Sequence, residues 1–296
     1  MWPMIRLTRR EMMMSAGPAL ALAPSAAAPA AQGKSRLRTA ICAYSYRDAL
    51  SKKRMSYDDV VKAAVDTEVD GLDLTVYWFP STGKEFLLPL RRLAYRNGVE
   101  IYSISVRSDM CRPSVEQRDQ ELEGVKKWVD VAAMLGAGHI RVFGGVVPKG
   151  RTEDEAASWV VDVLGRAAEY AGSHGVILGL ENHGGITARA ARIVEIVKKV
   201  NSPWVGVNLD TGNFDEDAYN QIAMILPHAV NVQFKTEIRT VKGKREESDW
   251  ERLTRMLAEG GYRGYMALEY EAKEPAETAV PRLLKKLNTL ARKYST

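Results

Sequence analysis

Three acidic residues stand at the ends of short apolar runs in the second half of the chain. Glu181 ends the run VILGLE, Asp210 ends WVGVNLD, and Glu269 ends YMALE. Apolar runs of this length, rich in Val, Leu and Ile, predict strands that are buried on both faces. A carboxylate at the end of a buried strand has lost much of its water, so it needs a hydrogen-bonding partner, a cation or a raised pKa. Three such strand ends indicate one shared site.

Further polar residues accompany these acids. His183 follows Glu181 by two positions, and the run AVNVQFK contributes Gln233 and Lys235. Converging carboxylates repel one another strongly at low dielectric, and a divalent cation would compensate this repulsion. A set that is rich in oxygen and includes one amide suits Mn2+, Mg2+ or Co2+ better than a tetrahedral zinc site. The alternative is that each acid caps the following helix or pairs with a lysine.

Such a site predicts carbon-acid chemistry on a sugar. A hard cation near a keto oxygen stabilises the negative charge that develops when a neighbouring C–H loses its proton. Glu181 and Glu269 would come from strands three apart in a barrel, so one could remove a proton and the other return it. Lys235 could neutralise an enediolate oxygen, or form a salt bridge to Asp210. Strand alternation points His183 toward the same site, and a solvent-facing loop histidine is the alternative.

The elements that would position these residues alternate regularly. Strand-like runs and helical patterns follow one another eight times, and Ser56 is a plausible N-cap of the first long helix. Eight such units in about 260 residues match an α/β protein with a single (β/α)8 TIM barrel, in which strand ends form the site. The predicted strands are 39–46, 69–77, 99–106, 139–143, 176–181, 204–210, 229–235 and 264–269; the predicted helices are 57–67, 85–97, 114–135, 152–174, 187–200, 215–225, 246–259 and 276–292.

The ends of the first four predicted strands carry aromatic and arginine side chains. Aromatic faces and guanidinium forks suit a carbohydrate, which has apolar C–H faces and many hydroxyl groups. Each aromatic residue could equally serve barrel packing. The predicted substrate-binding residues are Tyr46, Trp78, Arg107 and Arg141, together with Asn213 near the end of the sixth strand; Tyr77 also lies at a strand end.

The sequence resembles the xylose isomerase-like TIM barrels, specifically the sugar phosphate isomerase/epimerase family that includes ketose 3-epimerases and inosose dehydratases. The resemblance is carried by LENHGG (180–185), LDTGN (209–213), VQFK (232–235) and ALEYE (267–271). It implies that Glu181, Asp210 and Glu269 bind a divalent metal and that the two glutamates do acid–base work. Gln233 stands where the family usually has its fourth ligand, a histidine, and could ligate through its carbonyl oxygen. Asn213 also replaces a histidine that is frequent in the family.

Composition and the N-terminal segment indicate which partners to expect and where the protein is located. Without residues 1–33, which carry Arg6, Arg9, Arg10 and Glu11, the net charge of +5 becomes +3, which is too small on so large a domain to argue for nucleic acid. Cys42 and Cys111 alone exclude a disulfide framework, and the sequence does not show whether they pair. Residues 1–33 combine Arg9-Arg10 with an apolar stretch and small residues, which predicts a twin-arginine signal peptide. The alternative is a disordered basic tail. The barrel would then occupy residues 34–296 of a periplasmic or secreted protein.

These observations predict an exported, divalent-metal-dependent enzyme of the sugar isomerase/epimerase type. A 3-keto-glycoside lyase or dehydratase using the same site is the first alternative, and a non-catalytic sugar-binding barrel is another. The DNA-repair endonuclease IV branch needs a three-zinc cluster with several histidines, whereas only His183 of the four histidines is well placed. The expected partner is a small sugar or an oxidised glycoside, with no nucleic acid and no membrane after signal removal. The protein could form a homodimer.

Overall fold

Eight parallel strands form a closed barrel. They are β1 (Arg36–Cys42), β2 (Gly71–Thr75), β3 (Glu100–Ser105), β4 (His139–Val142), β5 (Ile177–Glu181), β6 (Val205–Asp210), β7 (Ala229–Phe234) and β10 (Arg263–Leu268). Their order around the barrel is β1-β10-β7-β6-β5-β4-β3-β2, and each neighbouring pair is parallel. This order confirms the predicted TIM barrel. The computed structural model describes residues 35–295, so the predicted signal peptide, 1–33, lies outside the described residues.

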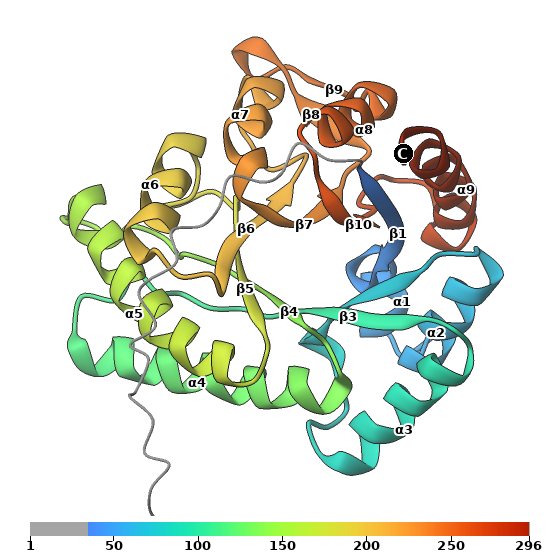
Figure 1. Cartoon of the computed structure of the whole chain (residues 1–296), viewed down its shortest axis with the longest axis horizontal. Helices are drawn as coiled ribbons and strands as arrows, with labels where there is room; N and C mark the ends of the chain where they lie inside the picture. The colour runs from blue at the N-terminus through green and yellow to red at the C-terminus, as the bar shows by residue number, and fades with distance from the viewer. Residues whose placement is uncertain (1–34, 296) are drawn as a thin grey trace, which may run out of the picture. The chain divides into compact units, whose positions relative to one another are not determined.

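Helices surround the barrel (Figure 1). Capping boxes at Ser56 and Thr152 and an N-cap at Ser114 fix where three of them begin, because each side chain accepts a hydrogen bond from a free backbone N–H. The helices are α1 (Arg47–Ser51), α2 (Tyr57–Asp66), α3 (Lys84–Arg96), α4 (Val115–Leu135), α5 (Glu153–Ser173), α6 (Ala190–Val200), α7 (Ala218–Ile225), α8 (Trp250–Glu259) and α9 (Ala276–Tyr294), with 3-10 turns η2 (Ala43–Tyr46), η3 (Val76–Trp78), η4 (Leu226–His228) and η5 (Val241–Gly243).

The predicted helix 246–259 is wrong in its first turn. Residues there form β9 (Arg245–Glu247), which pairs antiparallel with β8 (Glu237–Arg239) in a small two-stranded sheet. An ion pair between Arg245 and Glu237, 3.0 Å long, joins the two strands. The helix α8 starts only at Trp250, where Asp249 caps it through the backbone N–H of Arg252. The long connection after β7 therefore has structure of its own.

The main hydrophobic core lies between the barrel and its helices. Side chains of alternate strand residues, such as Leu72, Leu74, Ile140 and Leu178, are fully buried there. The barrel interior has only a small separate apolar cluster of Ala40, Cys42, Tyr102 and Ala267. Branched aliphatic side chains usually fill the interior of such barrels, whereas polar ones fill most of this one.

Two tiers of side chains fill the interior below the strand ends. At the N-terminal end, the rings of Tyr102 and Tyr265 stack with centroids 3.7 Å apart, and Arg38 lies over Tyr265. Above this plug lies a group that we call the middle tier, held together by hydrogen bonds between buried polar side chains. It consists of Asp73, Ser103, Ser105, His139, Asn208, Asn231 and Gln233.

Asp73 is the main acceptor of the middle tier. Its Oδ1 accepts hydrogen bonds from Ser103 and Ser105 at 3.0 and 2.8 Å, and its Oδ2 accepts one from Gln233 Nε2 at 3.0 Å. Asn208 Nδ2 donates to Gln233 Oε1 at 2.8 Å, and Asn231 donates to Asn208 in turn. Both ends of the Gln233 amide are therefore bonded within this tier.

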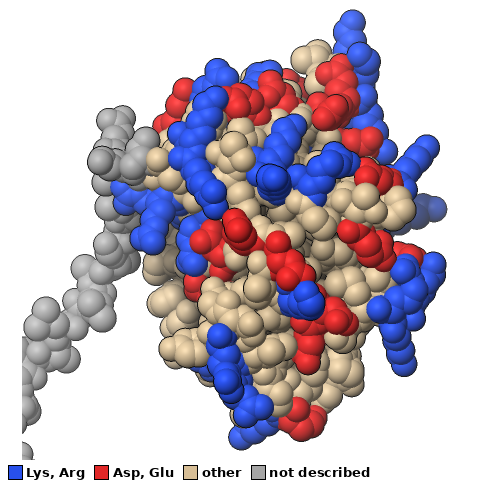
Figure 2. Space-filling view, turned by 90° about the vertical axis from the view of Figure 1, so that its right-hand side faces the viewer, with Lys and Arg blue, Asp and Glu red and all other residues tan. Residues whose placement is uncertain are grey.

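The outer surface carries both signs of charge. Figure 2 shows Lys and Arg side chains interspersed with Asp and Glu on the face that lies to the right in Figure 1. Within residues 35–295, no helix is long and apolar enough to cross a bilayer.

Candidate active site

A small cavity opens among the C-terminal ends of the strands. Its volume is about 180 Å³, below the range of roughly 300–1,000 Å³ that holds drug-sized ligands, so it suits a small molecule. Residues from the ends of all eight barrel strands meet around it, as expected for the site of a TIM barrel. The wall consists of Tyr44, Tyr77, Arg107, Arg141, Phe143, Glu181, His183, Asn213, Lys235, Glu269 and Glu271.

Lys235 holds the acids on one side of this cavity. Its Nζ lies 2.8 Å from Glu269 Oε1 and 3.3 Å from Asp210 Oδ2, and it also bonds to Glu271 Oε2. Burial lowers the pKa of Lys235, but the charges of Asp210, Glu269 and Glu271 outweigh burial and raise this pKa well above its usual value. Lys235 is therefore a permanent cation in contact with three carboxylates.

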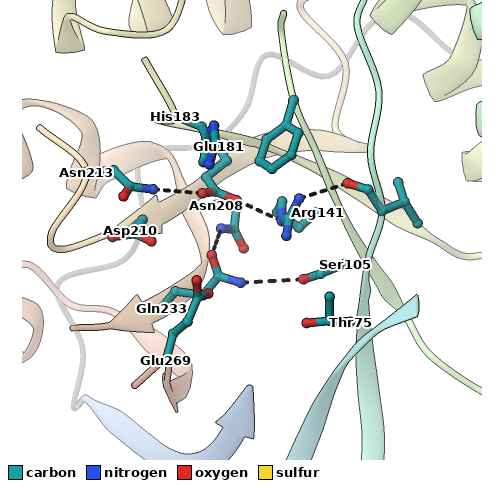
Figure 3. Close-up of polar contacts among 12 residues, drawn as sticks. Thr75, Ser105, Arg141, Glu181, His183, Asn208, Asp210, Asn213, Gln233 and Glu269 are labelled. Atoms are coloured by element: carbon teal, nitrogen blue, oxygen red, sulfur yellow. Dashed lines mark hydrogen bonds and ion pairs between the residues drawn. The ribbon is translucent and has the colours of Figure 1, made fainter. Parts of the chain in front are cut away.

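Arg141 holds Glu181 on the opposite side (Figure 3). Arg141 Nε lies 2.7 Å from Glu181 Oε2, while its Nη1 donates to the carbonyl of Val106 and to the hydroxyl of Tyr77. Asn213 Nδ2 donates to the other oxygen, Glu181 Oε1, at 2.9 Å. The predicted residues Arg141 and Asn213 therefore both contact Glu181 at the wall of the cavity.

The two glutamates differ in their electrostatic surroundings. Burial raises the pKa of Glu181 well above its usual range, although Arg141 opposes this rise. Burial also acts on Glu269, but the charges of Lys235 and Arg141 outweigh it and hold the pKa of Glu269 below its usual value. Two carboxyl groups whose pKa values move apart can take the separate roles of acid and base.

Asp210 lies behind the cavity wall. Its Oδ1 accepts a hydrogen bond from the backbone N–H of Gly212 at 2.8 Å, and its Oδ2 faces Lys235. Neither Asp210 Oδ2 nor Glu181 Oε2 accepts an aligned hydrogen bond, so each relies on the nearby cation. Burial raises the pKa of Asp210 to about 7, and Lys235 acts against this rise.

His183 and Arg107 form the rim of the cavity. The imidazole of His183 packs against the ring of Phe143, with centroids 4.1 Å apart, and is exposed to solvent. The rest of the ring is desolvated by its neighbours, and this desolvation and the charge of Arg141 lower the pKa of His183 below its usual value. The guanidinium of Arg107 lies 4.2 Å from the centroid of the Tyr77 ring. Both predicted residues face the opening.

Comparison with known proteins identifies the barrel. The family model described as "Xylose isomerase-like TIM barrel" matches residues 61–290. The chain belongs to this family. None of the curated proteins matches the chain. The family membership confirms the fold and the resemblance on which the sequence predictions drew.

Several solved structures align with nearly all of the described chain. D-Psicose 3-epimerase from Clostridium cellulolyticum H10, with D-tagatose, has a TM-score of 0.70 at 16% identity and covers 87% of this chain and 99% of its own. The IolI protein with a binding zinc atom has a TM-score of 0.70 at 16% identity, with 88% and 99% covered. The probable 3-DHS dehydratase AsbF from Bacillus anthracis has a TM-score of 0.62 at 15% identity, with 85% and 98% covered. At these identities the likeness establishes the fold.

The strand ends of this xylose isomerase-like barrel do not fit the divalent metal that the resemblance implies. Cations already contact Glu181, Asp210 and Glu269, and the carbonyl oxygen of Gln233 accepts the amide of Asn208. Within the described part of the chain, no group of three or more His, Cys, Asp or Glu side chains is arranged so that it could hold a metal ion. The four predicted ligands are therefore near one another but engaged elsewhere.

Two predicted substrate-binding residues lie away from the cavity. Tyr46 is buried in η2 and lines a separate pocket beside α9, because the chain turns into a 3-10 helix after Cys42. Trp78 stacks on Tyr44, with centroids 5.9 Å apart, and faces another pocket next to α2. Tyr44 lines the cavity in their place.

Sequence reasoning missed Tyr44, Phe143 and Glu271. Glu271 follows Glu269 by two positions, so strand alternation could have found it. Tyr44 similarly follows Cys42 by two. Cys42 and Cys111 are both free and buried, and Cys42 Sγ contacts Glu269 Oε2 at 3.4 Å.

Proposed function

We propose that this chain is an exported enzyme that removes a proton from the carbon next to a sugar carbonyl, as an isomerase or epimerase. One observation carries the proposal. Two carboxyl groups with different surroundings, Glu181 and Glu269, line the same small cavity as the ammonium group of Lys235. These are an acid, a base and a positive charge for a developing oxyanion.

The proton transfer assigns a role to each group. The Glu269 carboxylate takes the proton as the C–H bond breaks, and the electron pair moves to form an enediolate. The enediolate oxygen carries the new negative charge next to Lys235 Nζ, which stabilises it electrostatically. Glu181, whose pKa burial raises, returns a proton from the other side, since β5 and β10 are three strands apart. Return of the proton completes isomerisation or epimerisation.

The remaining wall fits a small polyhydroxylated substrate. Tyr44 and Tyr77 offer aromatic faces for the apolar C–H side of a sugar, and Arg107 and Asn213 offer hydrogen-bond donors for its hydroxyl groups. A structural neighbour, D-psicose 3-epimerase, was determined with D-tagatose. A ketose or an oxidised glycoside is therefore the substrate class that we propose. His183 at the rim would contact the bound sugar.

A lyase or dehydratase is the second candidate. The enediolate would expel an oxygen substituent from the next carbon if the substrate carries one there, and the carboxyl group of Glu181 would donate a proton to the leaving oxygen. The likeness to the probable 3-DHS dehydratase AsbF supports keeping this outcome. The substrate, rather than a different set of residues, would then decide between the two products. Divalent-metal dependence, which the sequence predicts, is not part of the proposal.

Hydrogen exchange in D2O tests the proposal. The purified protein is incubated with ketohexoses and with 3-keto-glucosides, and deuterium next to the carbonyl is followed by NMR. We expect wild-type protein to incorporate deuterium and form product. Glu181→Gln should still exchange at that carbon through Glu269, but should form little epimer. Glu274→Gln, outside the cavity, is the control. An absence of exchange with every substrate, or unchanged turnover in Glu181→Gln, would overturn the proposal.

Export is proposed from residues 1–33 alone. The twin-arginine pattern predicts that the mature protein begins after this segment and lies in the periplasm or outside the cell. Mass spectrometry of the N-terminus of protein recovered from the periplasm would detect cleavage. Replacing Arg9 and Arg10 by lysine should leave the precursor in the cytoplasm. Unchanged export of that variant would exclude the twin-arginine route.

A further inference from the structure

Lys235 occupies the position in which the carboxylates of this barrel converge. Its Nζ contacts Asp210 at the end of β6 and Glu269 and Glu271 after β10, and its side chain is only 8% exposed. A lysine buried to this extent is costly unless carboxylates neutralise it. Conversely, the three acids would repel one another without a cation between them. The contacts satisfy both requirements at once.

The protein fixes this lysine along its whole length. The backbone N–H of Lys235 donates to Thr211 Oγ1 and its carbonyl accepts from Trp250 Nε1, both at 2.9 Å. A Cβ on Gly212 would lie 2.7 Å from Cγ and 2.8 Å from Cβ of Lys235, so only glycine leaves room for the aliphatic stem. The ammonium group is therefore held in place by the fold rather than by its charges alone.

The remaining groups that could bind a metal are also engaged. Arg141 contacts Glu181, and Gln233 lies one tier deeper, with its oxygen bonded to Asn208 and its amide nitrogen to Asp73. Figure 3 shows Gln233 directed toward Asn208 and Ser105. A glutamine in the place of a ligand histidine thus completes the middle tier and contributes nothing toward a cation at the mouth.

We propose that the ammonium group of Lys235 takes the place of a divalent cation in this chain, so that the folded protein holds its acid cluster together without a metal. Lys235 then has a double role: it neutralises Asp210, Glu269 and Glu271 in the resting protein and presents positive charge to the cavity. The inference does not depend on the reaction proposed above, because it concerns the cation that the folded protein holds.

Metal content and stability test this inference directly. The full-length protein, purified without chelators, is analysed by elemental mass spectrometry, and Mn2+, Co2+ and Zn2+ are then titrated by calorimetry. We expect far less than one metal ion per chain and no saturable binding at the site. Thermal unfolding should be the same with EDTA and with Mn2+, because only a ligand that binds the folded state raises Tm. One tightly bound ion per chain, or a lower Tm in EDTA than in its absence, would overturn the inference.

A variant without the ammonium group sharpens the test. Lys235→Met leaves three acids without their shared cation, so it should unfold at lower temperature and gain stability when Mn2+ is added. Lys199→Met, which removes an exposed lysine at the end of α6, should not respond to Mn2+. If Lys235→Met folds and binds no divalent cation, the lysine does not stand in a cation's place. If it does not fold, Lys235→Arg keeps the charge and should remain metal-free, and metal binding by that variant would contradict the inference.

Discussion

Two successive tiers of the same barrel interior bury polar side chains in different ways. In the middle tier, mostly neutral amides and hydroxyls donate to one another and to Asp73. At the mouth, one position or two further along the strands, carboxyl groups contact the cations Lys235 and Arg141. Two carboxylate oxygens of the mouth, on Glu181 and Asp210, lack an aligned hydrogen bond, whereas the unpartnered side-chain atom of the middle tier within residues 35–295 is Nε2 of His139.

The difference separates stability from chemistry. Hydrogen bonds that are completed inside the protein stabilise the fold and leave little capacity for a ligand. Charged groups whose bonds are incomplete can still act on a substrate. Gln233 lies on β7 and Lys235 directly follows this strand, so their backbones are about 7 Å apart by the rise per residue, yet their side chains belong to different tiers. Changes in the two tiers should therefore be distinguishable by experiment.

The largest expected effect is on turnover. Glu269→Gln removes the proposed base but leaves Lys235 in contact with Asp210 and Glu271. We expect kcat to fall by a factor of about 10²–10⁴, as is usual when a general base is lost. The free energy of unfolding should change by much less than the activation free energy that corresponds to this loss of kcat. Steady-state kinetics and urea denaturation measure the two effects; a stability loss without a loss of turnover would assign Glu269 to the fold.

The middle tier should show the opposite behaviour. Asp73→Ala removes the acceptor of Ser103, Ser105 and Gln233, leaving buried donors unsatisfied. We expect the free energy of unfolding to fall by about 3 kcal/mol, since each buried unsatisfied group costs roughly 1–3 kcal/mol. Asp66→Ala, at a surface ion pair with Lys62, is the control and should change little. Equal losses in the two variants would mean that the tier adds no stability.

The sequence predicts the strands that carry both tiers, but not which side chains belong to the middle tier and which to the mouth. Apolar periodicity and turn residues locate the strands, because burial on both faces leaves a visible signal. The positions of Glu181, Asp210 and Glu269 at strand ends follow from the same signal. Tyr46 and Trp78 were misplaced because short 3-10 turns after β1 and β2 rotate the chain out of strand alternation.

The fate of Gln233 shows a second limit of sequence reasoning. A residue type and its place on a strand indicate which groups it could bind, but hydrogen bonds from other strands decide which it does bind. Asn208 and Asp73, on β6 and β2, engage both ends of the Gln233 amide. Lys235 likewise contacts residues that are distant in sequence, Asp210 on one side and Glu269 and Glu271 on the other. Such long-range pairings are not visible in local patterns.

His139 provides a pH test of the middle tier. Burial and the charge of Arg141 lower the pKa of His139 to about 3. As pH falls below about 6.5, the unfolded chain binds a proton at this histidine that the folded protein does not, so stability present above pH 6.5 is lost as pH falls toward 3. At pH 5 the loss should be about 2 kcal/mol.

His139→Gln isolates this contribution. The glutamine can keep a hydrogen bond to Ser103 but does not titrate. Urea denaturation at pH 7 and pH 5 should show a larger decrease for the wild type than for the variant, because the carboxylates common to both cancel in the comparison. The same decrease in both proteins would show that His139 is protonated in the folded state, and hence that the tier is open to water.

The smallest expected effect is that of a substitution at the rim of the cavity, outside the ion pairs of the mouth. Arg107 packs on Tyr77 and, unlike Arg141 and Lys235, has no carboxylate partner within residues 35–295. Arg107→Gln should therefore leave the unfolding free energy nearly unchanged. We expect KM to rise by about 3- to 10-fold with kcat unchanged. This result is expected when the lost contact stabilises the bound substrate and the transition state equally. A fall in kcat as large as that of Glu269→Gln would instead place Arg107 at the reacting carbon, and Arg107 would then count among the residues that take part in the reaction.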